Sequence, residues 1–221
     1  MAKRPLFLSS TGAGRHVQIV QVEFSWVAGL AVSQKQKCID SLHQAARTQA
    51  RVGRILEISS KSRDALGVAL GAFNLSMPVG SRTVCVEVAF QSSKRFTGGG
   101  PYLDILDKTS REAKGDKRLR ESGRLLEFIW QGEPWALQPT TAFYDWLYLN
   151  ALRANPQLLE DMLTYEAFTD IEFNPERSLN CQARSAALAH ALHKAGVFHD
   201  ALSSKDAFLQ ACTESRNDLF G

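Results

Sequence analysis

Residues 17–49 decide the fold class, because a strand pattern and a helix pattern follow one another there. VQIVQVEF, from Val17 to Phe24, alternates apolar and polar side chains, which predicts a β-strand. SQKQKCIDSLHQAARTQ, from Ser33 to Gln49, gathers its apolar residues on one face of a helix that Ser33 can cap. The residues of that face are Cys38, Ile39, Leu42 and Ala46.

The rest of the chain continues this mixture, with more helices than strands. Short strands are predicted over 54–58 and 125–130, a short strand or loop over 169–173, and a flexible loop over 97–101. Helices are predicted from Ser62, from Ser110, over 141–154, from Asn155-Pro156, over 178–195 and from Ser203 or Ser204. We therefore expect an α+β fold: one helix-rich domain, continuous over 1–221, with a few short strands. Within it, a basic portion (1–53) packs on a core domain (54–221).

Composition indicates a globular protein, since 44% of the 221 residues are hydrophobic and 22% are charged. We expect no membrane span, because no apolar run approaches the ~18 residues that crossing a bilayer needs, and no signal peptide. The four cysteines are widely spaced and form no CxxC motif, which favours a reduced, cytoplasmic protein.

Positive charge is concentrated in two regions. Residues 1–63 hold ten basic and three acidic side chains, so this part carries +7 and the remainder −4. A second basic cluster lies between Arg111 and Arg124. Such patches suit a polyanion such as a nucleic acid, although scattered surface charges are more often simply solvated.

The segment Val84–Phe96, VCVEVAFQSSKRF, has the strongest chemical content. On a helix, Glu87, Gln91 and Lys94 share one face and bring together a carboxylate, an amide and an amine. A partly buried carboxylate beside an amine can carry out acid–base or covalent catalysis. Spacing alone favours a salt-bridged surface helix over a catalytic one, and the β-branched opening also allows a strand at the start.

Two further segments carry polar groups that suit a nucleotide. Asp170 and Glu172 fall on one side if their segment is extended, and paired carboxylates can stabilise an oxocarbenium-like centre. The stretch Leu56–Ser62, LEISSKS, places hydroxyls, a Lys and backbone amides ahead of a helix, which suits phosphate. The alternatives are a polar strand edge and a merely capped helix.

Other motifs are absent from the sequence. It contains no GxxxxGK[ST], GxGxxG, HExxH or GxSxG pattern, so it does not support the ATPase, Rossmann, zincin or serine-hydrolase classes. His190 and His193 lack a third ligand and are expected to be structural. We expect no metal and no organic cofactor.

Several motifs together resemble the NADAR superfamily. Glu87, Gln91 and Lys94-Arg95-Phe96 resemble its EHxxQxxKF core motif, although Val88 replaces the usual His. The other similar segments are Gly71-Ala72-Phe73-Asn74-Leu75, Glu112-Ala113-Lys114, Asn155-Pro156-Gln157-Leu158-Leu159, Thr169-Asp170-Ile171-Glu172 and Ser178-Leu179-Asn180. Longer runs such as SQKQK (33–37), LEISSKS, FYDWLY (143–148), AFTDIEFNP (167–175) and NCQARSAAL (180–188) resemble one branch, the NADAR antitoxins encoded beside DarT-type toxins that ADP-ribosylate DNA bases.

This resemblance implies that the protein is an N-glycosidic bond hydrolase that removes ADP-ribose from guanosine in DNA. Glu87, Lys94 and Asp170 are then the expected catalytic residues. Lys94 either protonates the base or attacks the opened sugar as an amine. The implied ADP-ribose-binding residues are Ser59, Ser60, Lys61, Phe73, Asn74, Phe90, Gln91, Tyr144, Trp146, Glu172 and Asn180. The implied nucleic-acid contacts are Lys35, Lys37, Lys114 and Arg118.

Two other functions are compatible with the sequence. One is a non-catalytic module that binds ADP-ribose or a cognate DarT-type toxin, since a pocket with carboxylates can bind without turnover. The other is an N-glycosidase that acts on a small nucleotide-like metabolite.

Overall fold

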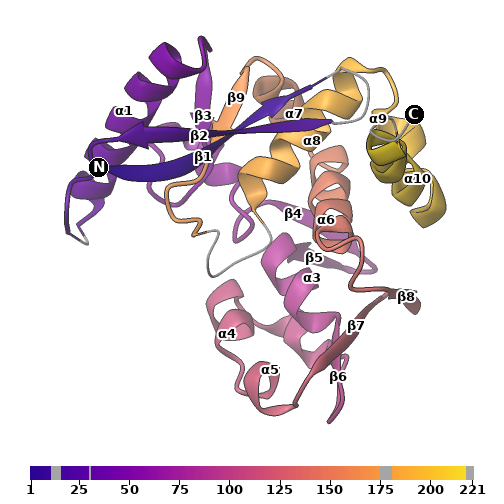
Figure 1. Cartoon of the computed structure of the whole chain (residues 1–221). Helices are drawn as coiled ribbons and strands as arrows, with labels where there is room; N and C mark the ends of the chain where they lie inside the picture. Colours follow the sequence, from indigo (N-terminus) through magenta and orange to yellow (C-terminus); the bar gives the residue numbers. More distant parts are fainter. Residues whose placement is uncertain (11–15, 30, 175–180, 218–221) are drawn as a thin grey trace. The chain divides into compact units, whose positions relative to one another are not determined.

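The computed structural model describes residues 1–10, 16–29, 31–174 and 181–217, and it has the predicted mixed α and β architecture (Figure 1). The chain forms two compact units: the first combines Met1–Gly71 with Pro156–Gly221, and the second is Ala72–Asn155. Residues 1–53 contribute two strands and a helix to the first unit, and a separate boundary at residue 53 stays a prediction. None of the helices in the described ranges combines the length and hydrophobicity needed to cross a membrane.

A four-stranded sheet in the order β2-β1-β9-β3 forms the centre of the first unit (Figure 1). Its strands are β1 (Ala2–Ser9), β2 (Val17–Phe24), β3 (Ile55–Glu57) and β9 (Ala167–Thr169). β1 is antiparallel to both β2 and β9, whereas β3 and β9 are parallel. The strands predicted over 17–24 and 54–58 are confirmed. β1 was not predicted, and its Pro5 is tolerated because β9 pairs only with Phe7 and Leu8.

Helices cover both faces of this sheet. α1 (Val32–Gln49) buries its four predicted apolar residues against the face that holds Leu6, Val22 and Ile55. α8 (Gln182–Lys194) packs on the opposite face, where the rings of Phe168 and His190 lie 6.1 Å apart. The two helices lie on opposite faces because neighbouring residues of a strand point in opposite directions: Ala167 packs on the α1 side, so Phe168 points to the other face.

Two predicted helix caps are wrong. Ala31, not Ser33, occupies the N-cap position of α1, and its N–H donates to the Gln34 side chain over 3.1 Å. Asp64 caps α2 (Ala65–Ala69) by accepting from the Leu66 N–H over 2.9 Å. The Ser62 hydroxyl is unavailable for this role because it accepts the Asp64 N–H over 3.2 Å.

The remaining helices of the first unit follow the sequence signals. They are α7 (Pro156–Met162), α9 (Phe198–Ala201) and α10 (Lys205–Asn217). Pro156 opens α7 as expected, Ser204 accepts from the Ala207 N–H at the start of α10, and Gly196 ends the Ala-rich helix at a φ of +75°. Residues 178–180, predicted to open that helix, lie outside the described residues.

The second unit combines a hairpin, a small three-stranded sheet and short helices (Figure 1). In chain order its elements are β4 (Ser76–Val79), β5 (Arg82–Cys85), α3 (Val86–Ser92), β6 (Lys94–Phe96), η1 (Leu103–Asp107), α4 (Ser110–Gly115), α5 (Arg118–Glu121), β7 (Leu125–Trp130), β8 (Glu133–Trp135) and α6 (Ala142–Arg153). The strand predicted over 125–130 and the helix over 141–154 are confirmed. The polar helix expected from Ser110 begins at that residue, with Thr109 as its N-cap, but it is divided into two short helices.

α3 runs through the core of this unit, and each of its residues is buried. Its apolar side is fixed by rings: Phe90 lies 5.2 Å from Phe128 of β7 and 6.2 Å from Phe143 of α6, measured between centroids. With its apolar side fixed in this way, α3 holds its polar side chains in a rigid setting.

Candidate functional site

Two polar side chains are buried on α3. Glu87 and Gln91 are each 7% exposed, and Gln91 Nε2 donates to Glu87 Oε1 over 2.9 Å. The Glu87 backbone is held as well, because its N–H donates to the Ala72 carbonyl over 2.9 Å. Burying a carboxylate costs free energy, so such a group in a rigid setting is a candidate functional residue.

The Gln91 amide is only half satisfied. Its Oε1 is buried and has no hydrogen-bond partner among the described residues. An unpaired buried acceptor costs about 1–3 kcal/mol, which a donor on a ligand would recover. The arrangement is therefore suited to a ligand that presents an O–H or N–H group.

Lys94 lies at the start of β6 rather than on the helix. α3 ends at Ser92, so the predicted i+7 position of Lys94 on the same helix is wrong. The strand start allowed by the β-branched residues is confirmed as β5.

The Lys94 amine nevertheless interacts electrostatically with Glu87. Its Nζ lies 4.7 Å from the centroid of the Phe90 ring, and burial lowers the pKa of this amine. The negative charge of Glu87 raises the pKa of Lys94, and the positive charge of Lys114 lowers it. A lysine in such surroundings loses its proton more readily and becomes available as a nucleophile or acid.

An exposed aromatic side chain lies beside Lys114. Phe73 is 43% exposed, and the Lys114 Nζ is 5.1 Å from its ring centroid. The Phe73 carbonyl accepts from the Ser110 hydroxyl over 3.1 Å, which ties the backbone of Phe73 to α4. Phe73 thus offers an accessible ring for stacking, and the neighbouring Asn74 is also exposed.

The other aromatic candidates of this unit lie deeper. Phe90 and Tyr144 are buried with their rings 5.3 Å apart, and half-buried Trp146 packs against Trp135 at 5.3 Å. Their contacts show that they pack the core of the unit.

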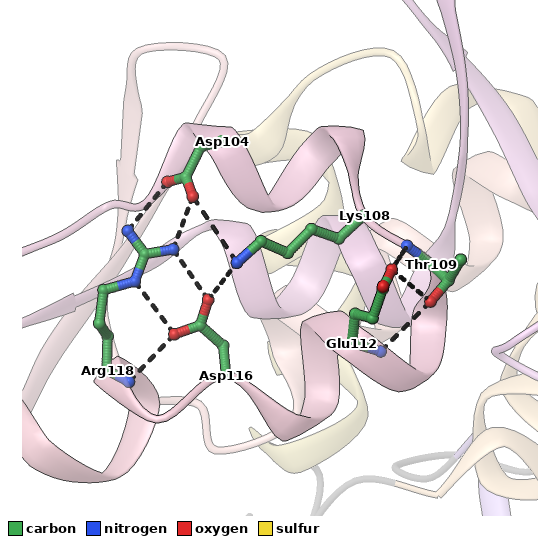
Figure 2. A network of polar contacts seen from close by, with 6 residues as sticks. All are labelled: Asp104, Lys108, Thr109, Glu112, Asp116 and Arg118. Atoms are coloured by element: carbon green, nitrogen blue, oxygen red, sulfur yellow. Dashed lines mark hydrogen bonds and ion pairs between the residues drawn. The ribbon is translucent and has the colours of Figure 1, made fainter.

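One member of the basic cluster of this unit, Arg118, is paired with acids of the same unit. Figure 2 shows the Arg118 guanidinium between the carboxylates of Asp104 and Asp116, at 2.6 and 2.8 Å, and Lys108 reaching Asp116 at 2.6 Å. These bonds hold the pKa of Asp116 well below its usual range. Arg118 therefore ties α5 to η1 in this structure.

A second set of polar groups lies in the first unit, around Glu57 of β3. Glu57 is 3% exposed; its Oε1 accepts from the Ile171 N–H over 2.8 Å and its Oε2 from the Thr169 hydroxyl over 2.7 Å. Thr169 Oγ1 also lies 2.8 Å from Nε2 of His43 on α1. Burial lowers the pKa of His43 to about 4, so this imidazole is neutral at pH 7.

Asp170 follows Thr169 in a tight turn. Its Oδ1 accepts the N–H groups of Glu172 and Phe173 over 2.9 and 3.1 Å. This turn contradicts the expected extended segment with both carboxylates on one side: Asp170 is 8% exposed, whereas the Glu172 side chain is 42% exposed. Burial, and then the charge of Glu57, raises the pKa of Asp170 to about 8.

The predicted phosphate loop adjoins this turn. Lys61 Nζ donates to the Ser60 hydroxyl over 2.5 Å and lies 3.7 Å from Glu172, whose other oxygen accepts from Ser60 over 2.9 Å. Ser59 is buried, and its hydroxyl accepts the Lys61 N–H over 3.2 Å. The loop therefore pairs its cation internally, and an incoming phosphate would compete with Glu172 for Lys61.

The model of the DarT1-associated NADAR antitoxin family matches residues 2–219. The chain belongs to this family. None of the curated proteins compared with this NADAR antitoxin matches it.

In this NADAR antitoxin, the structure groups the predicted site residues within each unit. The second unit holds Glu87, Gln91, Lys94, Lys114 and Phe73 around α3 and α4. The first unit holds Ser59, Ser60, Lys61, Asp170 and Glu172 around β3 and the turn after β9. Asn180 lies outside the described residues.

Sequence reasoning missed three residues of the antitoxin's first unit: Glu57, Thr169 and His43. The available signal was an acid at the end of an apolar strand, within LEISSKS, the stretch that was chosen for its hydroxyls. The described residues contain no group of three or more His, Cys, Asp or Glu side chains able to hold a metal ion.

Proposed function

We propose that this NADAR antitoxin hydrolyses the bond between ribose C1″ of ADP-ribose and a guanine nitrogen of DNA, and so reverses the modification made by its DarT-type toxin. Cleavage of that bond develops positive charge on the ribose and negative charge on the leaving base. The observation that carries the proposal is the buried Glu87 carboxylate, oriented by Gln91 and electrostatically coupled to the Lys94 amine.

Glu87 is the group proposed to stabilise the ribose cation. A carboxylate fixed in a water-poor site acts on developing charge more strongly than one in bulk solvent. The second acceptor, Gln91 Oε1, is proposed to take a ribose hydroxyl.

Lys94 has two possible roles, and the lowered pKa supports both. As an ammonium it transfers its proton to the leaving guanine; as a free amine it attacks C1″ of the opened ribose and forms a Schiff base that water hydrolyses. Borohydride added during turnover distinguishes them, because hydride fixes a Schiff base as a stable adduct on Lys94. Full activity of Lys94→Arg without any adduct would exclude the covalent role.

DNA is proposed to bind through the basic groups outside this centre. Lys37 is exposed, and the Lys35 Nζ lies 4.6 Å from the centroid of the Trp26 ring, so both are available to phosphates. Phe73 with Lys114 is proposed to stack a base, since stacking on an aromatic ring accepts any base.

The experiment that tests this function compares Glu87→Gln with the wild type on an oligonucleotide that carries ADP-ribosylated guanosine. We expect release of ADP-ribose to fall at least about 100-fold while the melting temperature stays within a few degrees. Glu127→Gln, a carboxylate paired with Arg95 in the same unit, is the matched control. Retained turnover in Glu87→Gln would remove Glu87 from the mechanism.

A further inference from the structure

Trp26 follows β2, and both of its chain neighbours are bonded to α1. The Ser25 N–H donates to the Ser41 hydroxyl over 3.2 Å. The Val27 N–H donates to Cys38 Sγ over 3.2 Å, and the thiol donates to the Val27 carbonyl over 3.3 Å. The Trp26 ring packs against the apolar core between α1 and the sheet. Trp26 is therefore held in place through its backbone neighbours and its ring.

Two cations lie over this ring. The guanidinium of Arg4 on β1 is 5.4 Å from the ring centroid, and the Nζ of Lys35 on α1 is 4.6 Å from it. Like charges repel, and the negative face of the indole offsets part of that repulsion. All three side chains are half-buried, so the two charges are screened less than charges on an open surface and can still be reached from solvent.

Neither Arg4 nor Lys35 forms an ion pair with an acid of the described residues. The three acids of residues 1–63 have other partners, and the pairs are Glu23 with Lys3, Asp40 with Arg63, and Glu57 with Thr169 and Ile171. Arg4 uses Nη1 on the Lys3 carbonyl over 3.0 Å, and its buried Nε is without a partner in the part of the chain that the structure describes. Two neighbouring cations without an acid between them are suited to bind an anion.

We propose that Arg4 and Lys35, held on the Trp26 ring, bind the phosphate backbone of the DNA strand on which this antitoxin acts. A guanidinium grips two oxygens of a phosphate, and an ammonium attracts the same group as a point charge. The inference adds Arg4 and Trp26 to the DNA contact of Lys35, and it rests on the proposed function only for the identity of the strand. The site lies wholly within the first unit.

A nucleic acid suits this site better than an acidic segment of a protein. The excess of basic over acidic side chains extends over residues 1–63, and a DNA strand presents a negative charge at every nucleotide. Cations beside an aromatic side chain are also the usual composition of surfaces that bind single strands. An acidic peptide is therefore the competing ligand in the test.

The test measures binding of the full chain to an unmodified, fluorescein-labelled single-stranded oligodeoxynucleotide by anisotropy at several salt concentrations. A phosphate contact contributes about 0.7 to the salt slope for a single strand, so Arg4→Ala should lower the slope by about 0.7 and the affinity at least about threefold. Lys3→Ala is the matched control, because it removes the same charge from the adjacent residue. Lys3 points to the opposite face of β1 and pairs with Glu23, so its replacement should leave the slope nearly unchanged.

Replacing the ring tests the arrangement of the charges separately from their number. Trp26→Leu keeps every charge but removes the face over which both cations lie, so the affinity should fall about twofold to fivefold. Trp26→Phe retains an aromatic face and should retain most of the affinity. If Trp26→Leu does not fold, the comparison of Arg4→Ala with Lys3→Ala decides alone.

A wild-type salt slope in Arg4→Ala, or equal losses of slope in Arg4→Ala and Lys3→Ala, would overturn the site. A glutamate peptide that binds the wild type more tightly than the oligonucleotide does, and loses that affinity in Arg4→Ala, would overturn the choice of a nucleic acid. The oligonucleotide carries no ADP-ribose. Binding that depends on Arg4 in a protein that never releases ADP-ribose would therefore contradict the proposed function and leave this site standing.

Discussion

Gln91 orients Glu87: the amide nitrogen donates to the carboxylate over 2.9 Å, four residues apart on one buried helix. The same amide leaves its oxygen without a partner in the described residues. One side chain therefore fixes the carboxylate and offers an acceptor beside it.

Replacing this amide tests both of its roles. Gln91→Met has a similar volume but neither donates to Glu87 nor accepts from a ligand, so we expect turnover to fall at least about tenfold, since a lost hydrogen bond to a charged group is worth roughly 1.5–3 kcal/mol. Gln91→Glu keeps the acceptor but places two carboxylates together, and should also be impaired. Steady-state release of ADP-ribose measures this, and wild-type rates in Gln91→Met would contradict the role.

The basic residues are expected to divide into structural and DNA-binding groups. Arg118→Ala should lower the melting temperature by roughly 2–4 °C, because it breaks the network with Asp104 and Asp116, yet hardly change the salt dependence of DNA binding. The double change Lys35→Ala and Lys37→Ala should lower that salt slope by about 1–2. The opposite pattern, with Arg118 setting the slope, would show that the network opens when DNA binds.

His43 makes stability depend on acid pH. Its folded pKa of about 4 lies below its ordinary value, so the unfolded chain binds more protons between pH 4 and 6.5 and folding weakens as the pH falls through that range. We expect the wild type to lose about 1–2 kcal/mol from this group between pH 7 and 5, a loss that His43→Gln should not show. Urea unfolding at the two pH values measures it, and equal losses in both proteins would contradict a buried neutral His43.

Asp170 makes stability change in the opposite sense. Because its folded pKa is raised, its contribution is full below its ordinary pKa and is lost as the pH rises toward about 8. Asp170→Asn lacks this loss, so its unfolding free energy should improve relative to the wild type by up to about 1.4 kcal/mol per pH unit between pH 5 and 8. A difference that stays constant over this range would contradict a protonated Asp170.

The sequence predicted the elements whose signals are local. The alternation in 17–24, the apolar face of α1, Pro156 at the start of α7 and Gly196 after α8 all depend on neighbouring residues. Caps were harder, because several polar side chains lie near each helix start: Asp64 rather than Ser62 accepts the Leu66 N–H, and Gln34 rather than Ser33 accepts the Ala31 N–H.

The sequence predicted the site only where the site residues lie within one short segment. Glu87 and Gln91 lie one turn apart on α3, so their spacing was informative even though Lys94 falls on a strand. Glu57 and Thr169 are 112 residues apart and meet through the pairing of β3 with β9, and His43 reaches them from α1. No local pattern encodes such contacts, which depend on the sheet register.

The central claim is that this NADAR antitoxin is an enzyme and not a binding module. The most direct measurement mixes a small fraction of an equivalent of protein with an oligonucleotide bearing ADP-ribosylated guanosine and counts free ADP-ribose. The account predicts many molecules of ADP-ribose released per molecule of protein, with unmodified oligonucleotide as the other product. Protection of one oligonucleotide per protein, with the modification intact, would contradict it.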